Sequence, residues 1–286
     1  MSINNSRRSD SERLGQGAML LCAVLWSTSG LFIKLIDWNP FVIAGMRSFI
    51  ASLFMIMIRF LFRRGEPLNL KYLLPGAVAY SATMLTFCIA NKLTTAANTI
   101  LIQYSAPVWA AIFGWILAKE KPRTANLISL AMVMGGLFLF FRDGLSGGSF
   151  IGNNLALLSG ICFGISSVFF RIQKKGNPAD SMLVAHILTA IISIPFFFVE
   201  TPSFSIYNTA AILFMGIAII GIASLLFSYA IQRITAVEAM LTAAIEPILS
   251  PIWVLLIIGE KPSFSAILGG VVIIAAVLVS AFGKRT

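Results

Sequence analysis

Glu246 and Pro247 are neighbours near the middle of a long apolar run. A carboxylate in the centre of a membrane helix is costly and normally faces a cavity or a partner. A proline beside it removes one helical hydrogen bond and frees backbone to meet a ligand or a neighbouring helix. Pro107 lies 140 residues earlier (247 − 107) in a similar run. This pattern predicts a duplicated membrane protein whose polar groups meet near the midplane.

Three roles for Glu246 stay open. The carboxylate could carry a proton, hold a substrate ammonium group, or fix a helix by bonding to neighbouring hydroxyls. Glu238, Thr242 and Glu246 follow i, i+4, i+8 spacing, which places them on one face of an unbroken helix. We therefore expect a polar stripe along this helix.

Other polar and aromatic residues concentrate near the middle of six apolar runs, as a polar pathway requires. Single hydroxyls often bond back to their own helix, but their joint restriction to these runs favours a shared cavity. Aromatic rings there offer stacking surfaces to a flat apolar molecule. The candidate binding residues are Trp26, Ser27, Thr28, Tyr80, Thr83, Phe87, Asn98, Gln103, Tyr104, Ser166, Ser167, Tyr229, Thr242 and Glu246. Pro107 and Pro247 are candidate helix-break or gating positions.

Three further residues receive structural interpretations. Arg47 lies about two turns inside its apolar run, so we expect its side chain to snorkel toward the interface. His186 is the only histidine, and we expect it to be packed or hydrogen-bonded. Trp38 lies near a helix end, which is typical of an interfacial anchor.

The composition is that of a membrane protein. The chain is 58% hydrophobic and 11% charged, with a mean hydropathy of +0.91, whereas soluble domains carry about 25% charged residues. About ten apolar runs are long enough to cross roughly 30 Å of hydrocarbon. They are 15–36, 40–62, 70–90, 95–118, 124–141, 151–173, 179–199, 207–231, 236–258 and 264–282. The cysteines lie in separate runs without CxxC spacing, which favours apolar packing over disulfide or metal roles.

The placement of the net charge of +10 argues for a membrane topology and against nucleic-acid binding. With ten spans and the N-terminus inside, 16 of the 21 lysines and arginines fall on one side. Only Lys34, Lys92, Arg142 and Lys261 fall on the other. The positive-inside rule then predicts that both termini are cytoplasmic. The full-length first run reads as an uncleaved helix.

The two halves of the chain share a pattern at an offset of 140. Glu120-Lys121-Pro122 and Glu260-Lys261-Pro262 are identical triplets, each following its internal proline at the same distance. Because five spans per half is odd, the second copy must be inverted, a common plan of secondary transporters. The predicted divisions are a cytoplasmic tail (1–14), a first repeat (15–141), a linker (142–150) and a second repeat (151–286).

The chain resembles a known family. The Trp26–Gly30 stretch (WSTSG) with Lys34, the Pro107…Glu120-Lys121-Pro122 pattern and the two five-helix halves are similar to the drug/metabolite transporter superfamily, in its ten-helix EamA branch. Within that branch the overall similarity is greatest to bacterial aromatic amino acid exporters. The resemblance implies an all-α polytopic membrane protein of ten helices, with two inverted five-helix repeats around a central cavity. Spans 1, 3, 4, 6, 8 and 9 would line it.

We therefore expect a secondary transporter or facilitator of the bacterial inner membrane. It would export small amphipathic metabolites by alternating access, above all aromatic and other apolar amino acids. Threonine-like amino acids, nucleosides and drugs stay open as substrates, and a channel is the alternative from a different class. An intramembrane enzyme would need catalytic groups that the sequence does not suggest. Expected partners are a small-molecule substrate and the lipid bilayer, without nucleic acid, metal or cofactor. The oligomeric state stays open, and a monomer is compatible with the pattern.

Overall fold

The computed structural model of the chain describes residues 2–62, 70–142, 149–174, 176–199, 202–249, 252–253 and 263–282. All regular secondary structure in these residues is helical, so the predicted all-α class is confirmed. The helices are α1 (Ser2–Trp26), α2 (Ser29–Leu35), α3 (Pro40–Phe62), α4 (Leu70–Leu93), α5 (Ala96–Gln103), α6 (Ala106–Leu117), α7 (Thr124–Phe141), α8 (Phe150–Ile172), α9 (Pro178–Ser193), α10 (Phe196–Val199), α11 (Ile206–Phe214), the π-helix η2 (Met215–Ile222), α12 (Ala223–Ile231), α13 (Ala236–Ala243) and α15 (Phe264–Phe282).

These helices follow the apolar runs of the sequence. Within the described residues, seven helical segments are long and apolar enough to cross a membrane, and two shorter apolar helices cover Thr124–Phe140 and Ile267–Ala281. The protein is therefore a multi-pass membrane protein. The count of ten spans stays a prediction, because the ninth run (236–258) extends beyond the described residues. The triplet Glu260-Lys261-Pro262 also lies outside the described residues. Helix α1 begins at Ser2, within the predicted cytoplasmic tail (1–14), and continues to Trp26.

Two helices are interrupted beside the prolines that the sequence singled out. Helix α5 ends at Gln103 and α6 begins at Ala106, after two residues outside the helices, with Pro107 in its first turn. Helix α13 ends at Ala243, and helical turns resume at Glu246. The cause is the same in both cases, because proline has no N–H to donate to the carbonyl four residues earlier. That carbonyl belongs to Gln103 in one helix and to Ala243 in the other.

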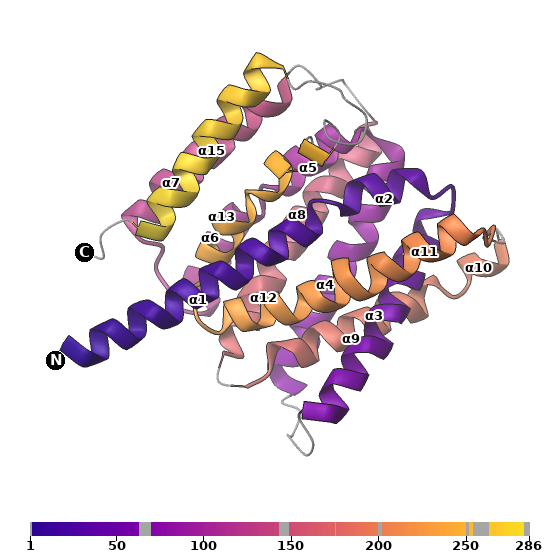
Figure 1. Cartoon of the computed structure of the whole chain (residues 1–286), viewed down its shortest axis with the longest axis horizontal. Coiled ribbons are helices and arrows are strands. Elements are labelled where there is room, and N and C mark those ends of the chain that lie inside the picture. Colours follow the sequence, from indigo (N-terminus) through magenta and orange to yellow (C-terminus); the bar gives the residue numbers. More distant parts are fainter. Residues whose placement is uncertain are drawn as a thin grey trace.

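The helices of the two halves of the chain pack against one another in corresponding pairs. Helix α3 lies along α9, α7 along α15, and α6 against α13. Helix α4 packs on α8, and their counterparts in the other half, α12 and α1, also pack on each other. Likewise α4 packs on α9, and their counterparts η2 and α3 pack on each other. Figure 1 shows α7 and α15 side by side at the edge of the bundle, with both chain termini at the same end.

Small residues bring α8 directly onto the backbone of α6. A Cβ atom added at Gly164 would lie 2.8 Å from the carbonyl oxygen of Ala106 and 2.9 Å from the nitrogen of Ala110. Ala106, Ala110 and Gly114 recur every four positions along α6, and the closest approach to this helix is that of α8, although α13 also contacts α6. Direct backbone contact of this kind is typical of small residues in membrane helices.

The interpretation of Trp38 as an interfacial anchor is wrong. Its side chain is only 4% exposed, and its indole Nε1 donates to the carbonyl of Ser203 over 3.1 Å. The ring also packs edge-on against Phe204. Trp38 therefore joins the turn between α2 and α3 to the segment before α11.

Candidate functional site

A cavity of about 50 Å³ lies at the centre of the bundle. The interrupted helices bring their ends to it: α1 and α2 meet there, and so do α5 and the turn that begins at Glu246. Helices α3, α4, α8 and η2 complete the wall. The lining residues are Trp26, Ser29, Arg47, Tyr80, Thr83, Met84, Phe87, Gln103, Phe163, Ile220 and Glu246.

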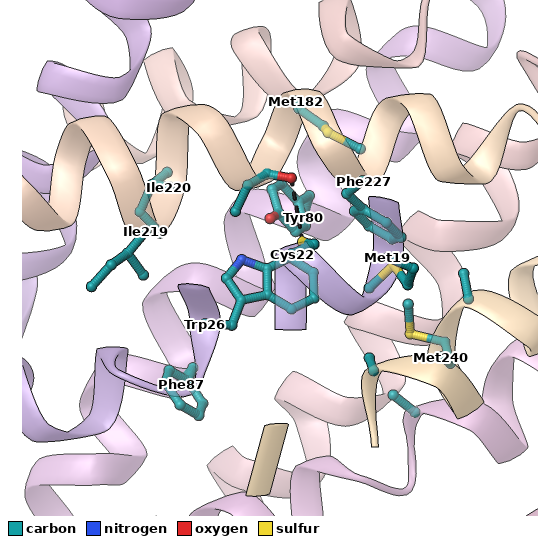
Figure 2. Packing of buried hydrophobic residues seen from close by; sticks show 14 of the residues in the cluster. Met19, Cys22, Trp26, Tyr80, Phe87, Met182, Ile219, Ile220, Phe227 and Met240 are labelled. Atoms are coloured by element: carbon teal, nitrogen blue, oxygen red, sulfur yellow. Dashed lines mark hydrogen bonds between the residues drawn. The ribbon is translucent and has the colours of Figure 1, made fainter. Parts of the chain in front are cut away.

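One part of the wall is aromatic. Trp26 packs edge-on against Phe163, with ring centroids 5.6 Å apart, and against Phe227 at 5.5 Å. Tyr80 lies beside the same Phe163 ring at 6.2 Å. Figure 2 shows Trp26 close to Tyr80 and Phe227, with Cys22 beside them. These rings offer edges and faces to an apolar group, which is the arrangement that aromatic pairs favour.

Glu246 supplies a carboxylate to the same cavity. Its Oε2 accepts a hydrogen bond of 2.8 Å from the Tyr104 hydroxyl, which also lies 2.7 Å from the carbonyl oxygen of Ala243. The Ala243 carbonyl is the one that Pro247 leaves without a helical donor. Tyr104 thus joins the interruption after α5 to the interruption after α13. The helix-fixing role of Glu246 is therefore present in this structure, and its other two roles stay open.

Arg47 is the cationic member of the cavity wall, and the prediction that it snorkels to the interface is wrong. The residue is 1% exposed. Its Nη1 donates to Ser29 Oγ over 3.4 Å and its Nη2 to Met84 Sδ over 3.7 Å, while its Nε has no partner among the described residues. The sequence signal was present, because Arg47 is the only lysine or arginine that lies well inside a predicted span and not near its end.

Close packing fixes the backbone that carries Arg47. A Cβ atom added at Gly216 in η2 would lie 2.5 Å from Ile50 Cβ and 3.1 Å from the carbonyl oxygen of Arg47. A Cβ atom added at Gly45 would lie 2.4 Å from Ser193 Cβ in α9. Helix α3 is therefore held between two neighbours on either side of Arg47. A π-helix such as η2 is rare and is frequently found at functional sites.

The structure places the predicted binding residues in three groups. Six of them line the central cavity: Trp26, Tyr80, Thr83, Phe87, Gln103 and Glu246. Tyr104 lies behind Glu246 and is 7% exposed. Gln103 is positioned by its Nε2, which donates to Ser159 Oγ of α8 over 2.9 Å.

The third group lies outside the wall of this cavity, and a role of these residues in binding stays a prediction. The hydroxyls that donate to carbonyls of their own helix are those of Ser27, Thr28, Ser166, Ser167 and Thr242. Such back-bonds are the ordinary role of Ser and Thr in helices. Asn98 lies beside Thr94 and Asn153, where it links α5 to α8. Tyr229 is 38% exposed and its ring lies under the Arg233 guanidinium, 3.3 Å from ring centroid to Cζ.

The expected stripe of Glu238, Thr242 and Glu246 does not exist as one face. The interruption at Ala244–Ile245 breaks the helical register between Thr242 and Glu246. Glu238 instead forms a capping box with Thr235 at the start of α13 and an ion pair with Arg123. Capping boxes satisfy the free N–H groups at a helix start.

Glu238 belongs to a charged end of the bundle, which is separate from the central cavity. Glu120 after α6 pairs with Arg171 over 3.0 Å and with Lys174 over 3.0 Å. A cavity of about 630 Å³ lies among these charged side chains. Each of the two pairs, Glu120–Arg171 and Arg123–Glu238, joins the first half of the chain to the second.

His186 is packed and hydrogen-bonded, as the sequence predicted. Its Nε2 lies 3.0 Å from Ser224 Oγ, and its ring packs edge-on against Tyr80. Sequence reasoning missed Phe163, Met84 and Ile220. No signal separates Phe163 from the other phenylalanines, of which the chain has 23.

A bundle of apolar helices around a small polar and aromatic cavity defines a multi-pass membrane protein with an internal cavity. A family model described as the EamA-like transporter family matches residues 13–142 and 150–282. The chain therefore belongs to the EamA-like transporter family, within the drug/metabolite transporter superfamily.

Relatives of similar length are transporters too. An uncharacterized transporter of Archaeoglobus fulgidus is 24% identical to this chain, and the match covers 92% of this chain and 95% of the length of that transporter. The uncharacterized inner membrane transporter YicL of Salmonella typhimurium is 24% identical over 96% of this chain and 97% of its own. A solved crystal structure matches with a TM-score of 0.79 at 20% identity, over 93% of this chain and 96% of that one, which shows a shared fold.

Proposed function

We propose that this protein is a secondary transporter of the bacterial inner membrane that exports aromatic and other apolar amino acids by alternating access. The observation that carries the proposal is the central cavity, where Glu246 and Gln103 lie beside a wall of aromatic rings. Binding sites for small molecules are mostly apolar, with a few placed polar groups that fix orientation. An amino acid with an aromatic or aliphatic side chain has matching apolar and polar ends.

We also propose ten spans arranged as two inverted repeats, residues 15–141 and 151–286. The family model matches two segments that nearly coincide with these repeats. The helix pairs support the same division. Helix α4 of the first half packs on α8 of the second, and their counterparts α12 and α1 pack on each other. The interruptions at Tyr104–Ser105 and Ala244–Ile245 are also 140 residues apart (244 − 104). Inverted repeats of this kind place substrate at their interface.

The size of the cavity supports alternating access. A volume of about 50 Å³ holds one or two water molecules at roughly 30 Å³ each, whereas ligand pockets typically measure about 300–1,000 Å³. An amino acid therefore enters only after the surrounding helices have separated. The ion pairs Glu120–Arg171 and Arg123–Glu238 join the two halves at the proposed cytoplasmic end. They would have to break each time that end opens.

Transport into proteoliposomes tests the proposal. Liposomes that contain the purified protein and are preloaded with unlabelled L-phenylalanine are expected to accumulate external radiolabelled L-phenylalanine by exchange, with saturation. Protein-free liposomes measure leakage. A lack of protein-dependent flux for every apolar amino acid would contradict the proposed function. Flux that does not saturate, together with single-channel conductance, would favour a channel.

Two tryptophan variants make this experiment specific to the cavity. Trp26→Ala removes a ring from the cavity wall, and stacking worth about 0.5–1.5 kcal/mol beyond burial corresponds to a loss of about twofold to tenfold in apparent affinity. Trp115→Ala is the matched control, because Trp115 is 57% exposed on the outer face of α6. The control is expected to transport at the wild-type rate.

A further inference from the structure

The central cavity carries two opposite charges that do not pair with each other. Arg47 and Glu246 both line it, yet no ion pair joins them. A buried ion normally needs a partner, because removal from water is costly. An arginine keeps its charge in any protein environment. The arrangement therefore leaves a cation and a carboxyl group facing one small space.

The guanidinium of Arg47 has unused hydrogen-bonding capacity. It carries five N–H donors, and its contacts in this structure are a long bond to a hydroxyl and a weak one to a thioether. Its Nε has no partner in the part of the chain that the structure describes. Both Ser29 and Met84 also line the cavity, so the guanidinium group lies at its wall. A carboxylate is the group that best fills such a fork, through two parallel hydrogen bonds.

Glu246 offers the complementary half of a clamp. One carboxylate oxygen accepts a hydrogen bond from Tyr104, and none of the described residues bonds the other oxygen. An ionised carboxylate has about four acceptor positions, so room for further donors remains. An ammonium group supplies three donors and a positive charge, and it would replace the ion-pair partner that Glu246 lacks.

We propose that Arg47 binds the α-carboxylate and Glu246 the α-ammonium of a zwitterionic amino acid, whose apolar side chain lies against Trp26 and Phe163. This assignment rests on the proposed function and deepens it, because it makes both charges of the substrate obligatory. Neutral nucleosides and simple amine drugs, which lack one or both charges, are then poor substrates. Together the two charged groups and the substrate form a neutral, fully paired set.

Competition by analogues on the wild-type protein tests the clamp without any variant. In the exchange assay with radiolabelled L-phenylalanine, unlabelled L-phenylalanine is compared with phenylalaninamide, which lacks the carboxylate, and with 3-phenylpropionate, which lacks the ammonium group. Loss of a charged hydrogen-bonded pair weakens binding by roughly 10-fold to 100-fold. We therefore expect each analogue to compete at least about 10-fold more weakly than phenylalanine. Equal competition by the amide would overturn the role of Arg47, while the labelled flux itself would still support the proposed function.

Two variants assign each charge to its residue. Arg47→Met is expected to abolish the preference for phenylalanine over phenylalaninamide and to keep discrimination against 3-phenylpropionate. Glu246→Gln is expected to do the reverse. A merely structural role would lower all fluxes together and leave both preferences unchanged, which would overturn the assignment. Arg59→Met is the matched control, because Arg59 in the same helix pairs with Asp180 over 3.0 Å and lines a different pocket.

Discussion

Tyr104 is the residue that joins the two interrupted helices. Its hydroxyl reaches the carbonyl of Ala243 and the carboxyl group of Glu246, so one side chain satisfies a broken helix and fixes a cavity residue. A hydroxyl donates one proton, so it serves one of these acceptors at a time unless Glu246 itself carries a proton. In that protonated state Glu246 would donate to Tyr104 while Tyr104 donates to Ala243. The contact therefore links the protonation of Glu246 to the geometry of the interruption.

Removal of this hydroxyl gives a direct prediction of stability. Tyr104→Phe leaves the Ala243 carbonyl without its donor in a buried place, and an unsatisfied buried acceptor costs about 1–3 kcal/mol. We expect the midpoint of thermal unfolding in detergent to fall, and transport to slow. Tyr207→Phe is the control, because Tyr207 is 82% exposed and should keep the wild-type midpoint. Equal midpoints for the Tyr104→Phe variant and the wild type would show that the bond contributes nothing.

Residue-level prediction from the sequence succeeded where chemistry and location were both unusual. Glu246 and Gln103 were recognised because polar groups in the middle of apolar runs are costly. The hydroxyls of Thr242 and Ser166 instead bond to their own helix in this structure, and the sequence cannot separate such a back-bond from a hydroxyl that faces a cavity. Arg47 was recognised as unusual but assigned the wrong direction, since only the packing of α3 between η2 and α9 decides where the guanidinium points.

At the scale of elements, the apolar runs predicted most helix bounds closely. The predicted run 40–62 is α3, and 264–282 is α15. Hydrophobic length determines these bounds directly. The interruptions are only partly visible in the sequence. Prolines mark those at Tyr104–Ser105, Ile194–Pro195 and Ala244–Ile245, whereas no proline lies beside the interruption at Ser27–Thr28. The π-helix η2 also follows from packing, because its sequence MGIAIIGI is simply apolar.

The contact between α7 and α15 provides a stability test with adjacent matched positions. A Cβ atom at Gly269 would lie 2.5 Å from the carbonyl oxygen of Gly136 and 2.5 Å from the nitrogen of Phe140. Because both atoms belong to backbone, Gly269→Ala is expected to destabilise the protein by about 1–3 kcal/mol. At Gly270 the nearest atom is 3.6 Å away, so Gly270→Ala should be neutral or stabilising by up to about 1 kcal/mol.

Unfolding curves of the two glycine variants measure this difference. The expected order of unfolding midpoints is Gly270→Ala at or above wild type, and Gly269→Ala below it. The same midpoint for both variants would mean that α7 and α15 do not approach each other at backbone distance. The test is independent of substrate, so it examines the packing of the bundle even if the transported compound is not an amino acid.

At the scale of the whole molecule, the protein is a bundle whose two halves meet around one small cavity. The proposed inversion explains why α3 and α9 pack together, and why α7 and α15 do so at the edge of the bundle (Figure 1). It also explains the asymmetry of the site. Glu246 occupies a position whose counterpart, 140 residues earlier, is Ala106. One half thus supplies a carboxyl group where the other supplies a packing surface for Gly164.

The inverted arrangement is the claim on which the transport mechanism depends, and thiol labelling tests it most directly. In a variant without Cys22, Cys88 and Cys162, single cysteines replace Lys119, in the turn after α6, or Ser263, just before α15. The proposed inversion puts these two sites on opposite faces of the membrane. In intact cells, a membrane-impermeant maleimide should label the Ser263→Cys variant but not the Lys119→Cys variant, which should react only after the membrane is permeabilised. Labelling of both cysteines from the same side would contradict the inverted repeat and the export mechanism with it.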